Sequence, residues 1–416
     1  MAVIISACNQ DPDPDPVVYD DTPYTLDFGT FPPPTAQAAN LLTAQKIVLG
    51  RMLFYETKLS SNLTQACADC HRQEHAFTDT AQFSVGAEGD IGGRQAMAIF
   101  NMAWHSYGFF WDGRAPELHD QATQPIQNPV EMNETIPVAV LDNAIAIDHV
   151  DLAANVYTNS AESGGLSLLD DDFNGFADDV NGYDVSDNDN NPRPPGNGDG
   201  FAHGTHVAGI VGAVTNNGSG IASLGYSCTI LPVKIASNSN GSALNGSIDG
   251  IFYAMQSGAD VINMSWGVQT DAATLRTVIA QAAADGIVLV AAAGNDGNQN
   301  LHYPAAYSEV ISVGSTNQND QLSAFSNFGS TIDLVAPGEG IYSTLPQGNN
   351  TYGDLSGTSM AAPLVAALAS LVKAEFPSFN RIQIQQRMEQ GCDDISAQNP
   401  GQNGQYGLGE SMFFKP

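Results

Sequence analysis

The sequence predicts a two-domain protein, in which a small, mainly α-helical domain at residues 36–135 precedes an α/β domain at residues 136–416. The second domain is expected to hold a parallel sheet between helices. Three observations lead to this prediction. The 416 residues suffice for two or three hydrophobic cores, the first part shows helical spacing, and the second alternates short apolar runs with helical stretches.

Residues 36–55 open the first domain with the pattern of an amphipathic helix. The apolar positions are Leu41, Leu42, Ile47, Val48, Leu49, Met52 and Leu53. Because residues three and four apart share one face of a helix, this spacing predicts a helix with an apolar side.

The second domain alternates strand-like and helix-like segments. The predicted strands are residues 136–141, 229–235, 261–264, 287–293, 310–313 and 332–335, and the predicted helices are residues 204–214, 247–256, 272–284 and 359–374. Such alternation is typical of a parallel sheet covered by helices on both faces. The junction at residues 128–136 has no Gly-, Ser- or Pro-rich linker.

The composition indicates a loop-rich, extracytoplasmic protein without a nucleic-acid partner. The 13 Lys and Arg residues against 45 Asp and Glu give a net charge of −32, which repels polynucleotides and anionic lipids and attracts cations. The 41 Gly and 22 Pro residues fall between apolar runs, as in loop-rich enzymes. No stretch approaches the roughly 18 consecutive apolar residues of a membrane span.

Residues 5–8 (ISAC) precede a repeat of Asp and Pro and are similar to a bacterial lipoprotein signal. Cys8 would then carry a lipid anchor, the single predicted contact with a membrane. The apolar region is short and lacks basic residues, so a chance match is the alternative. In either case, we expect residues 9–35 to be a solvated, acidic tether.

Residues 67–71 (CADCH) have the spacing that attaches haem c covalently. In this pattern two thioethers, here at Cys67 and Cys70, hold the macrocycle while the adjacent histidine, His71, ligates iron. The alternatives are a zinc site, which needs two more ligands, and a redox dithiol, which normally lies in a βαβ unit. We therefore predict one covalent haem c.

Three residues of the second domain have the chemistry of a nucleophilic hydrolase. Ser359 follows a turn at Gly357 and lies at the predicted start of a helix, where free amides favour negative charge. His203 follows a glycine-rich loop, and Asp142 ends an apolar strand, at the edge where parallel sheets build their sites. A serine hydroxyl needs an imidazole to take its proton and a carboxylate to orient that imidazole. Taken alone, Ser359 is better explained as an ordinary helix cap than as a nucleophile.

The motifs HGTHVAG, AAAGN, YPAAY, VAPG and GTSMAAP follow one another in residues 136–416, and the order is Asp142, His203, Ser359. Together they resemble the subtilisin family of serine proteases. The resemblance implies a subtilisin-like fold and an endopeptidase with Ser359 as nucleophile, His203 as general base and Asp142 as orienting acid. It also implies that Asn295 and the Ser359 amide stabilise the oxyanion.

The same resemblance implies a pocket for a polypeptide substrate. Its backbone walls would be formed by Ser265, Trp266, Gly267, Ala292, Ala293 and Gly294. His302 falls where the family lines the pocket floor, often with a small residue, so we expect it to narrow the pocket or add polarity. One departure is the residue after Asp142, which is usually Thr or Ser in the family and is Asn143 here.

The acidic stretch at residues 170–179 places many oxygen atoms beside a glycine. Calcium prefers six to eight oxygen ligands from flexible loops. The predicted ligands are Asp170, Asp172, Asn174 and Asp178. A solvated run of charges is the alternative, because the spacing is not that of an EF-hand.

The CADCH motif is accompanied by residues 49–55 (LGRMLFY) and 110–115 (FWDGRA). These segments resemble the N-terminal half of bacterial di-haem cytochrome c peroxidases, which implies a cytochrome c-like fold. By this resemblance Gln121 and Glu131 flank the open face of a peroxide-reducing haem, and Trp111 helps electrons arrive from the second haem. The implied partner is an electron-donor protein. The second CxxCH of that family is absent from this sequence.

The sequence therefore favours a bacterial serine endopeptidase located in the periplasm, in the cell envelope or outside the cell, with an appended haem module. One alternative is a haem-dependent cytochrome c peroxidase or electron-transfer protein. Another is a chain composed of two gene fragments. This alternative would explain the abrupt junction and the single CxxCH.

Overall fold

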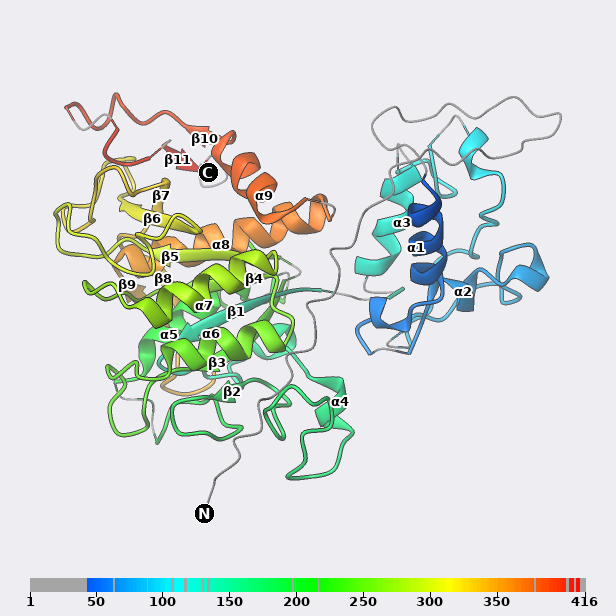
Figure 1. Cartoon of the computed structure of the whole chain (residues 1–416), viewed down its shortest axis with the longest axis horizontal. Coiled ribbons are helices and arrows are strands. Elements are labelled where there is room, and N and C mark those ends of the chain that lie inside the picture. Colours follow the sequence, from blue (N-terminus) through cyan, green and yellow to red (C-terminus); the bar gives the residue numbers. More distant parts are fainter. Residues whose placement is uncertain are drawn as a thin grey trace, which may run out of the picture. The chain divides into compact units, whose positions relative to one another are not determined.

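The computed structural model describes residues 43–411, apart from 63, 88, 106–107, 116–117, 129–130, 133–134, 197, 199, 216, 227, 378, 402–403 and 408 (Figure 1). Cys8 and the predicted tether lie outside the described residues. The chain divides into two compact units, Met1–Glu134 and Thr135–Pro416.

The first unit contains short helices joined by long loops. Its α-helices are α1 (Ala44–Phe54), α2 (Cys67–Cys70) and α3 (Leu118–Gln127), and its 3₁₀ turns are Thr57–Leu59, Gln73–His75 and Met102–Trp104. Thr43 caps α1, because its hydroxyl accepts from the Lys46 N–H at 3.2 Å. The predicted helix therefore exists, and its part before Thr43 lies outside the described residues.

The apolar side of α1 is exposed rather than buried. Val48 is 59% exposed and Met52 66% exposed. The small core of this unit forms elsewhere, around Met102, Phe109 and Ala115. Helical spacing thus predicted the helix correctly, but no described residue of the unit covers its apolar face.

The described residues of the second unit form a nine-stranded sheet in the order β10-β11-β7-β6-β5-β4-β1-β3-β2. Neighbouring strands are parallel, except that β10 and β11 are antiparallel to each other. The strands are β1 (Ile136–Asp142), β2 (Tyr183–Asp184), β3 (Cys228–Lys234), β4 (Val261–Met264), β5 (Val288–Ala292), β6 (Val310–Thr316), β7 (Leu334–Pro337), β10 (Cys392–Asp393) and β11 (Glu410–Ser411). A separate hairpin joins β8 (Ile341–Leu345) and β9 (Thr351–Leu355). The helices are α4 (Ser160–Ser163), α5 (Ala202–Gly212), α6 (Ser247–Gln256), α7 (Ala273–Ala284), α8 (Thr358–Glu375) and α9 (Arg381–Glu389), with a 3₁₀ turn at Ala153–Asn155.

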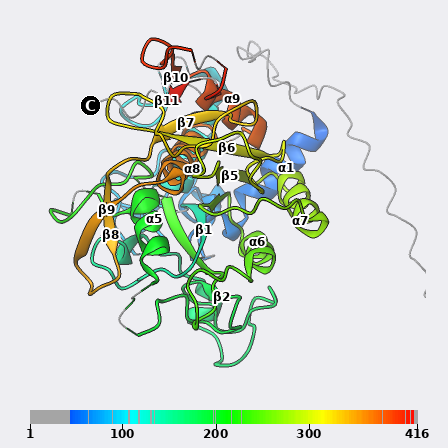
Figure 2. The same ribbon diagram turned by 90° about the vertical axis from the view of Figure 1, so that its left-hand side faces the viewer.

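The sheet lies between two layers of helices, as the alternating pattern predicted. Along β1, Val138 and Val140 pack into the core shared with α5 and α8. Ala139 and Leu141 point to the opposite face and pack with α6 and α7. Figure 2 shows these two helix pairs on opposite sides of the strands. Because β1 is buried on both faces, its sequence is a nearly continuous run of apolar residues.

Parallel pairing places several chain segments at one edge of the sheet. β1 pairs with β3 and β4, and β4 pairs with β5, so these strands end together. Ligand and catalytic sites of open α/β sheets form at this carboxyl edge. None of the helices formed by the described residues is long and apolar enough to cross a membrane.

Candidate functional site

The carboxylate of Asp142, at the end of β1, contacts the imidazole of His203, in the first turn of α5. His203 Nδ1 lies 2.8 Å from Oδ1 and 2.9 Å from Oδ2 of Asp142. The Asp142 side chain is 4% exposed and that of His203 is 35% exposed. Burial disfavours the imidazolium, but the charge of Asp142 and its hydrogen bond outweigh burial and raise the pKa of His203. This pairing directs Nε2 of His203 away from Asp142, free to act on another group.

Asn143 holds the end of β1 against the start of α5. Its Oδ1 accepts from the Gly204 N–H at 3.0 Å, and its own N–H donates to Asp142 Oδ1 at 2.7 Å. Gly204 is needed here because a Cβ at this position would lie 2.4 Å from the Ala144 carbonyl oxygen. The residue that departs from the expected family pattern therefore supports the turn after Asp142 through its amide.

Ser359 is the second residue of α8, and its main-chain carbonyl has an unusual partner. Pro363 stands four residues later and has no N–H to donate to that carbonyl. The hydroxyl of Ser265, just after β4, donates to it instead at 2.8 Å. The Ser359 hydroxyl in turn donates to the Ser265 carbonyl at 3.0 Å. Among the described residues no hydrogen bond joins the Ser359 hydroxyl to His203, so a rotation of this side chain is needed to bring the two together.

Two N–H donors border a small space beside Gly357. Asn295 Oδ1 accepts from the Thr358 N–H at 2.8 Å and from the Thr358 hydroxyl at 3.0 Å. Since only the oxygen of the amide can accept, these bonds direct Nδ2 of Asn295 toward the open side. A Cβ on Gly357 would lie 3.4 Å from this Nδ2 and 3.6 Å from the Ser359 nitrogen. An anion in this space would meet both donors.

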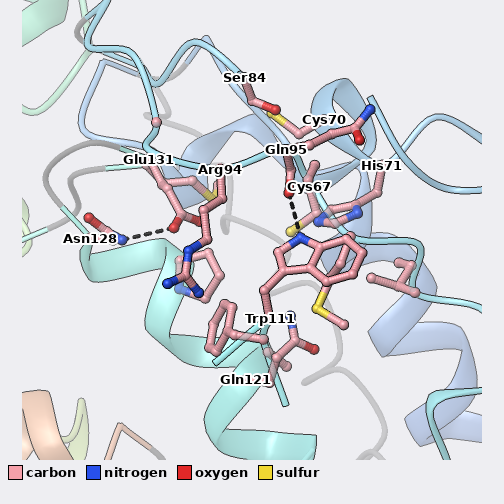
Figure 3. A pocket seen from close by; sticks show the side chains of 18 of the residues that line it. Cys67, Cys70, His71, Ser84, Arg94, Gln95, Trp111, Gln121, Asn128 and Glu131 are labelled. Carbon is pink, nitrogen blue, oxygen red and sulfur yellow. Dashed lines mark hydrogen bonds between the residues drawn. The ribbon is translucent and has the colours of Figure 1, made fainter. Parts of the chain in front are cut away.

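A cavity of about 740 Å³ in the first unit is lined by Cys67, Cys70 and His71 (Figure 3). Both cysteines are free, and burial raises the pKa of each thiol. His71 Nδ1 lies 3.1 Å from the Phe77 carbonyl, which can only accept, so Nδ1 carries the proton and Nε2 keeps its lone pair. Two thiols, a fixed imidazole and a roomy cavity fit a covalently attached haem.

The predicted haem-pocket residues line the same cavity. The Trp111 indole N–H donates to the Gln95 carbonyl at 2.9 Å, and Gln121 is buried. Glu131 accepts from the Asn128 amide at 2.8 Å. Burial raises the pKa of Glu131, although Arg114, Asn128 and His71 act against it. In Figure 3 Glu131 and Cys70 lie on different sides of the cavity.

Comparison with known families accounts for both units. Residues 133–409 match the subtilase family, which is two thirds of the chain. The chain belongs to the subtilase family. Residues 44–166 match the family described as di-haem cytochrome c peroxidase. The two matches overlap at residues 133–166, where β1 is part of the subtilase sheet.

Several characterised subtilases are similar to this chain. It is 37% identical over 298 residues to a thermophilic serine proteinase from Bacillus sp. strain AK1, covering 72% of this chain and 66% of that protein. It is 40% identical over 259 residues to thermitase from Thermoactinomyces vulgaris, covering 62% and 81% of the two chains. Subtilisin E from Bacillus subtilis is 35% identical over 280 residues, covering 66% and 63%.

Solved subtilase structures are similar as well. A protease from Pseudoalteromonas arctica PAMC 21717 superposes with a TM-score of 0.54 and 31% identity, covering 66% of this chain and 87% of that one. The chain spans about two thirds of the length of the Bacillus proteinase and 63% of subtilisin E.

In this subtilase, His302 fills the space between the two predicted pocket walls. A Cβ on Gly294 would lie 2.8 Å from Cγ of His302, and a Cβ on Gly267 would lie 3.4 Å from its Nδ1. His302 Nε2 lies 2.7 Å from Asp296 Oδ2, and the Gln269 amide donates to the same oxygen at 3.0 Å. The other predicted wall residues, Ser265, Trp266, Ala292 and Ala293, are all buried.

The acidic loop brings together a different set of carboxylates from the predicted one. Oxygen atoms of Glu162, Asp172 and Asp179 all lie within 4.8 Å of one another. Of the predicted ligands only Asp172 belongs to this cluster. The other three fold the loop: Asp170 accepts from the Asn174 N–H, Asp178 accepts from the Leu168 N–H, and the Asn174 amide donates to Asp172 and Asp179. No Lys or Arg among the described residues forms an ion pair with the cluster, and burial raises the pKa of Asp179.

Sequence reasoning gave no individual role to Thr358, Glu162 or Asp179. Thr358 is fully buried and its hydroxyl accepts from the Gly294 N–H at 3.2 Å while donating to Asn295. The signal for Thr358 was its place beside Ser359 in GTSMAAP. No local signal separated Glu162 from the other acidic residues, because the path of the loop brings it to Asp172.

Proposed function

We propose that this subtilase is an extracytoplasmic serine endopeptidase that hydrolyses polypeptides and carries a c-type haem module. Asp142, His203 and Ser359 are its catalytic triad. The observation that carries the proposal is the buried Asp142 carboxylate paired at 2.8 Å with Nδ1 of His203, at the same sheet edge as the start of α8. Family membership and the similarity to proteinases support it.

The chemistry follows from these positions. With substrate bound, the Ser359 hydroxyl turns from the Ser265 carbonyl to Nε2 of His203 and gives up its proton as the oxygen attacks the peptide carbonyl carbon. Asp142 stabilises the imidazolium that forms. The oxyanion is held by the Ser359 N–H and Asn295 Nδ2. His203 then protonates the leaving amine, and water releases the acyl group from Ser359 by the same steps in reverse order.

Residues 265–267 and 292–294 are the walls that bind the substrate residue before the cut. His302 stands between them and reduces the room for a side chain. A large aromatic residue would have to displace the imidazole from Asp296, whereas a small residue would not. The enzyme therefore prefers small residues at this position.

The direct test is hydrolysis of casein and short peptides by the full chain. Ser359→Ala should abolish hydrolysis, and Ser308→Ala, at an exposed serine, should leave it unchanged. Activity that persists in Ser359→Ala would contradict the proposal.

The haem module is the second part of the proposal. Cys67 and Cys70 would hold the haem through thioethers and His71 Nε2 would ligate its iron, which agrees with the hydrogen bond from Nδ1 of His71 to the Phe77 carbonyl. Bound haem would supply redox chemistry, and an electron-donor protein would be its partner. Trp111 lines the cavity and is the residue proposed to help electrons arrive. Gln121 and Glu131 line the same cavity, and the raised pKa of Glu131 would let its carboxyl carry a proton there. Attachment of this kind takes place outside the cytoplasm, which supports that location.

The haem proposal is tested on chain produced with a cytochrome c maturation system. Wild type should keep haem after denaturation and organic extraction, and Cys67→Ala/Cys70→Ala should lose it. Haem that is extracted from wild type would contradict covalent attachment. Turnover of hydrogen peroxide by the loaded chain would favour the alternative peroxidase function.

We also propose that Glu162, Asp172 and Asp179 bind calcium. Three carboxylates without a basic partner offer the hard oxygen ligands that this cation prefers. Calcium in hundredfold excess over its dissociation constant would add about 3 kcal/mol to the folding free energy. Calcium should therefore raise Tm of the wild type after chelation but not of Asp172→Asn. Asp285→Asn, at an exposed carboxylate elsewhere, is the control, and equal calcium responses in all three would contradict the site.

A further inference from the structure

Two arginines line the cavity in the first unit and share one carboxylate. Arg94 Nη1 lies 3.2 Å from Asp112 Oδ2, and Arg114 Nη1 lies 3.2 Å from Asp112 Oδ1. Both side chains are among the residues that line the cavity, together with Cys67 and His71. The chain has 13 basic residues against 45 acidic ones, so two guanidinium groups at one cavity are a local concentration of positive charge.

The positions of these arginines are set by a tight loop. The Phe109 N–H donates to the Ala115 carbonyl at 2.7 Å, which closes the loop. Phe110 has a left-handed backbone (φ 61°), which a bulky residue rarely adopts, and its ring lies 3.6 Å below the Arg114 guanidinium. Arg114 is therefore held by its ring contact as well as by Asp112.

Asp112 occupies only some of the N–H donors of Arg94 and Arg114. A guanidinium has five N–H donors, and Asp112 contacts only Nη1 of each. Within the described part of the chain, no other side chain pairs with Nε or Nη2 of Arg94 or Arg114. Donors of this kind, placed at the rim of an apolar cavity, are suited to a ligand with carboxylate groups.

We propose that Arg94 and Arg114 bind the two propionate carboxylates of the haem attached at Cys67 and Cys70. This inference rests on the proposed haem module and adds the anchor for its charged edge. A haem has an apolar macrocycle and two carboxylates, and the cavity offers apolar walls and two guanidinium groups. In Figure 3 Arg94 lies on the side of the cavity away from Cys70 and His71. Asp112 holds both guanidinium groups at the rim before the ligand arrives.

The test uses the full chain with covalent haem and compares Arg94→Gln, Arg114→Gln and Arg51→Gln. Arg51 lies in the last turn of α1 and does not line the cavity, so Arg51→Gln controls for loss of one charge. Resonance Raman spectroscopy follows the propionate bending band, and a redox titration gives the midpoint potential. Loss of a guanidinium should shift the band and lower the potential, because an uncompensated propionate charge favours ferric iron.

Arg94→Lys and Arg114→Lys keep the positive charge but lose the planar guanidinium, which can donate two parallel hydrogen bonds to one carboxylate. We expect them to shift the band while the potential stays near that of wild type. If Arg94→Gln takes up no haem and Arg94→Lys does, the need for a charge at this position is supported. Cavity variants whose band and potential match those of Arg51→Gln would overturn this inference while leaving the haem module intact. A wild type without covalent haem would overturn both.

Discussion

The Ser265 hydroxyl donates to the Ser359 carbonyl at 2.8 Å, and the Ser359 hydroxyl donates back to the Ser265 carbonyl at 3.0 Å. The first bond replaces the helical bond that Pro363 cannot make. Asn263 completes the arrangement, because its amide donates to the Ser265 hydroxyl oxygen at 3.0 Å. The end of β4 is thereby tied to the start of α8, where the proposed nucleophile lies.

Removal of this tie should slow catalysis without weakening substrate binding. We expect Ser265→Ala to lower kcat about tenfold, which corresponds to the loss of one hydrogen bond, and to leave KM nearly unchanged. Pro363→Ala supplies an N–H to the Ser359 carbonyl, so Ser265→Ala should cost less in that background. A double-mutant cycle of kcat measures this difference. Equal losses in both backgrounds would show that Pro363 and Ser265 are not coupled.

The acid limb of the pH profile should report His203. The base acts only when neutral, so kcat/KM falls as pH drops through its pKa, which Asp142 raises against the effect of burial. Asp142→Asn removes the charge that raises this pKa. The acid limb should therefore move to lower pH, and kcat should fall about 10⁴-fold, the size known for this change in serine proteases. If the acid limb of Asp142→Asn stays at the pH of the wild type, it reports the titration of a group other than His203.

Thr358 should matter because it orients the Asn295 amide. Thr358→Val removes the hydroxyl that donates to Asn295 Oδ1 and leaves the buried Gly294 N–H without its acceptor. We expect kcat to fall by about tenfold. Thr358→Ser keeps the hydroxyl and should retain activity. Asn295→Ala should lose about 10²–10³ in kcat, a range established for the corresponding donor in subtilisin itself. Full activity of Thr358→Val would contradict the role of Thr358 in orienting the Asn295 amide.

His302 should set the preference for the residue before the cut. His302→Gly removes the ring between Gly267 and Gly294, and we expect kcat/KM for an aromatic residue to rise by about 10–100-fold relative to alanine. Gln269→Ala, which breaks only a bond to Asp296, should change this ratio little. Paired peptides that differ at this one residue give the ratio. A ratio that His302→Gly leaves unchanged would exclude His302 from the pocket.

His206 should make the second unit sensitive to acid. It is fully buried, its Nε2 lies 2.9 Å from the Ile341 carbonyl and 3.0 Å from the Gly353 carbonyl, and Nδ1 has no partner among the described residues. Burial and the nearby His203 lower the pKa of His206 from 6.5 to about 4. The hydrogen bonds to the two carbonyls and the charge of Asp354 act in the opposite direction.

The sign of the effect follows from the two states of His206. The folded chain keeps this ring neutral while the unfolded chain protonates it, so stability is present above pH 6.5 and is lost as pH falls toward 4. Between pH 7 and pH 5 this loss amounts to about 2 kcal/mol. Urea unfolding of Ser359→Ala, which cannot digest itself, measures the slope, and His206→Gln should flatten it. An equal slope in both would contradict the role of His206.

Much of the second unit could be predicted because its strands are buried on both faces. The apolar runs around Val138 and Val290 mark β1 and β5 without reference to distant residues. The order of strands could not be predicted, since an apolar run does not identify its neighbours. The hairpin β8–β9 was missed because its residues are only partly buried and show no continuous apolar run.

In the candidate sites, too, some features could be predicted from the sequence and others depend on the fold. Asp142, His203 and Ser359 stand in recognisable motifs, so their proposed roles could be predicted from the sequence. The bond from Ser265 to Ser359 joins residues 94 positions apart and depends on how β4 meets α8. Likewise, Glu162 reaches Asp172 only through the path of the acidic loop. Contacts of this kind need the folded chain.

The role of Ser359 as nucleophile is tested by labelling with a serine-directed phosphonate, followed by mass mapping of the modified peptide. One adduct is expected, on Ser359, which forms in step with the loss of peptidase activity and is absent from Ser359→Ala. His203→Ala should react far more slowly, because the hydroxyl then lacks its base. An adduct on another serine, or full peptidase activity with Ser359 modified, would contradict the role of Ser359 as the nucleophile.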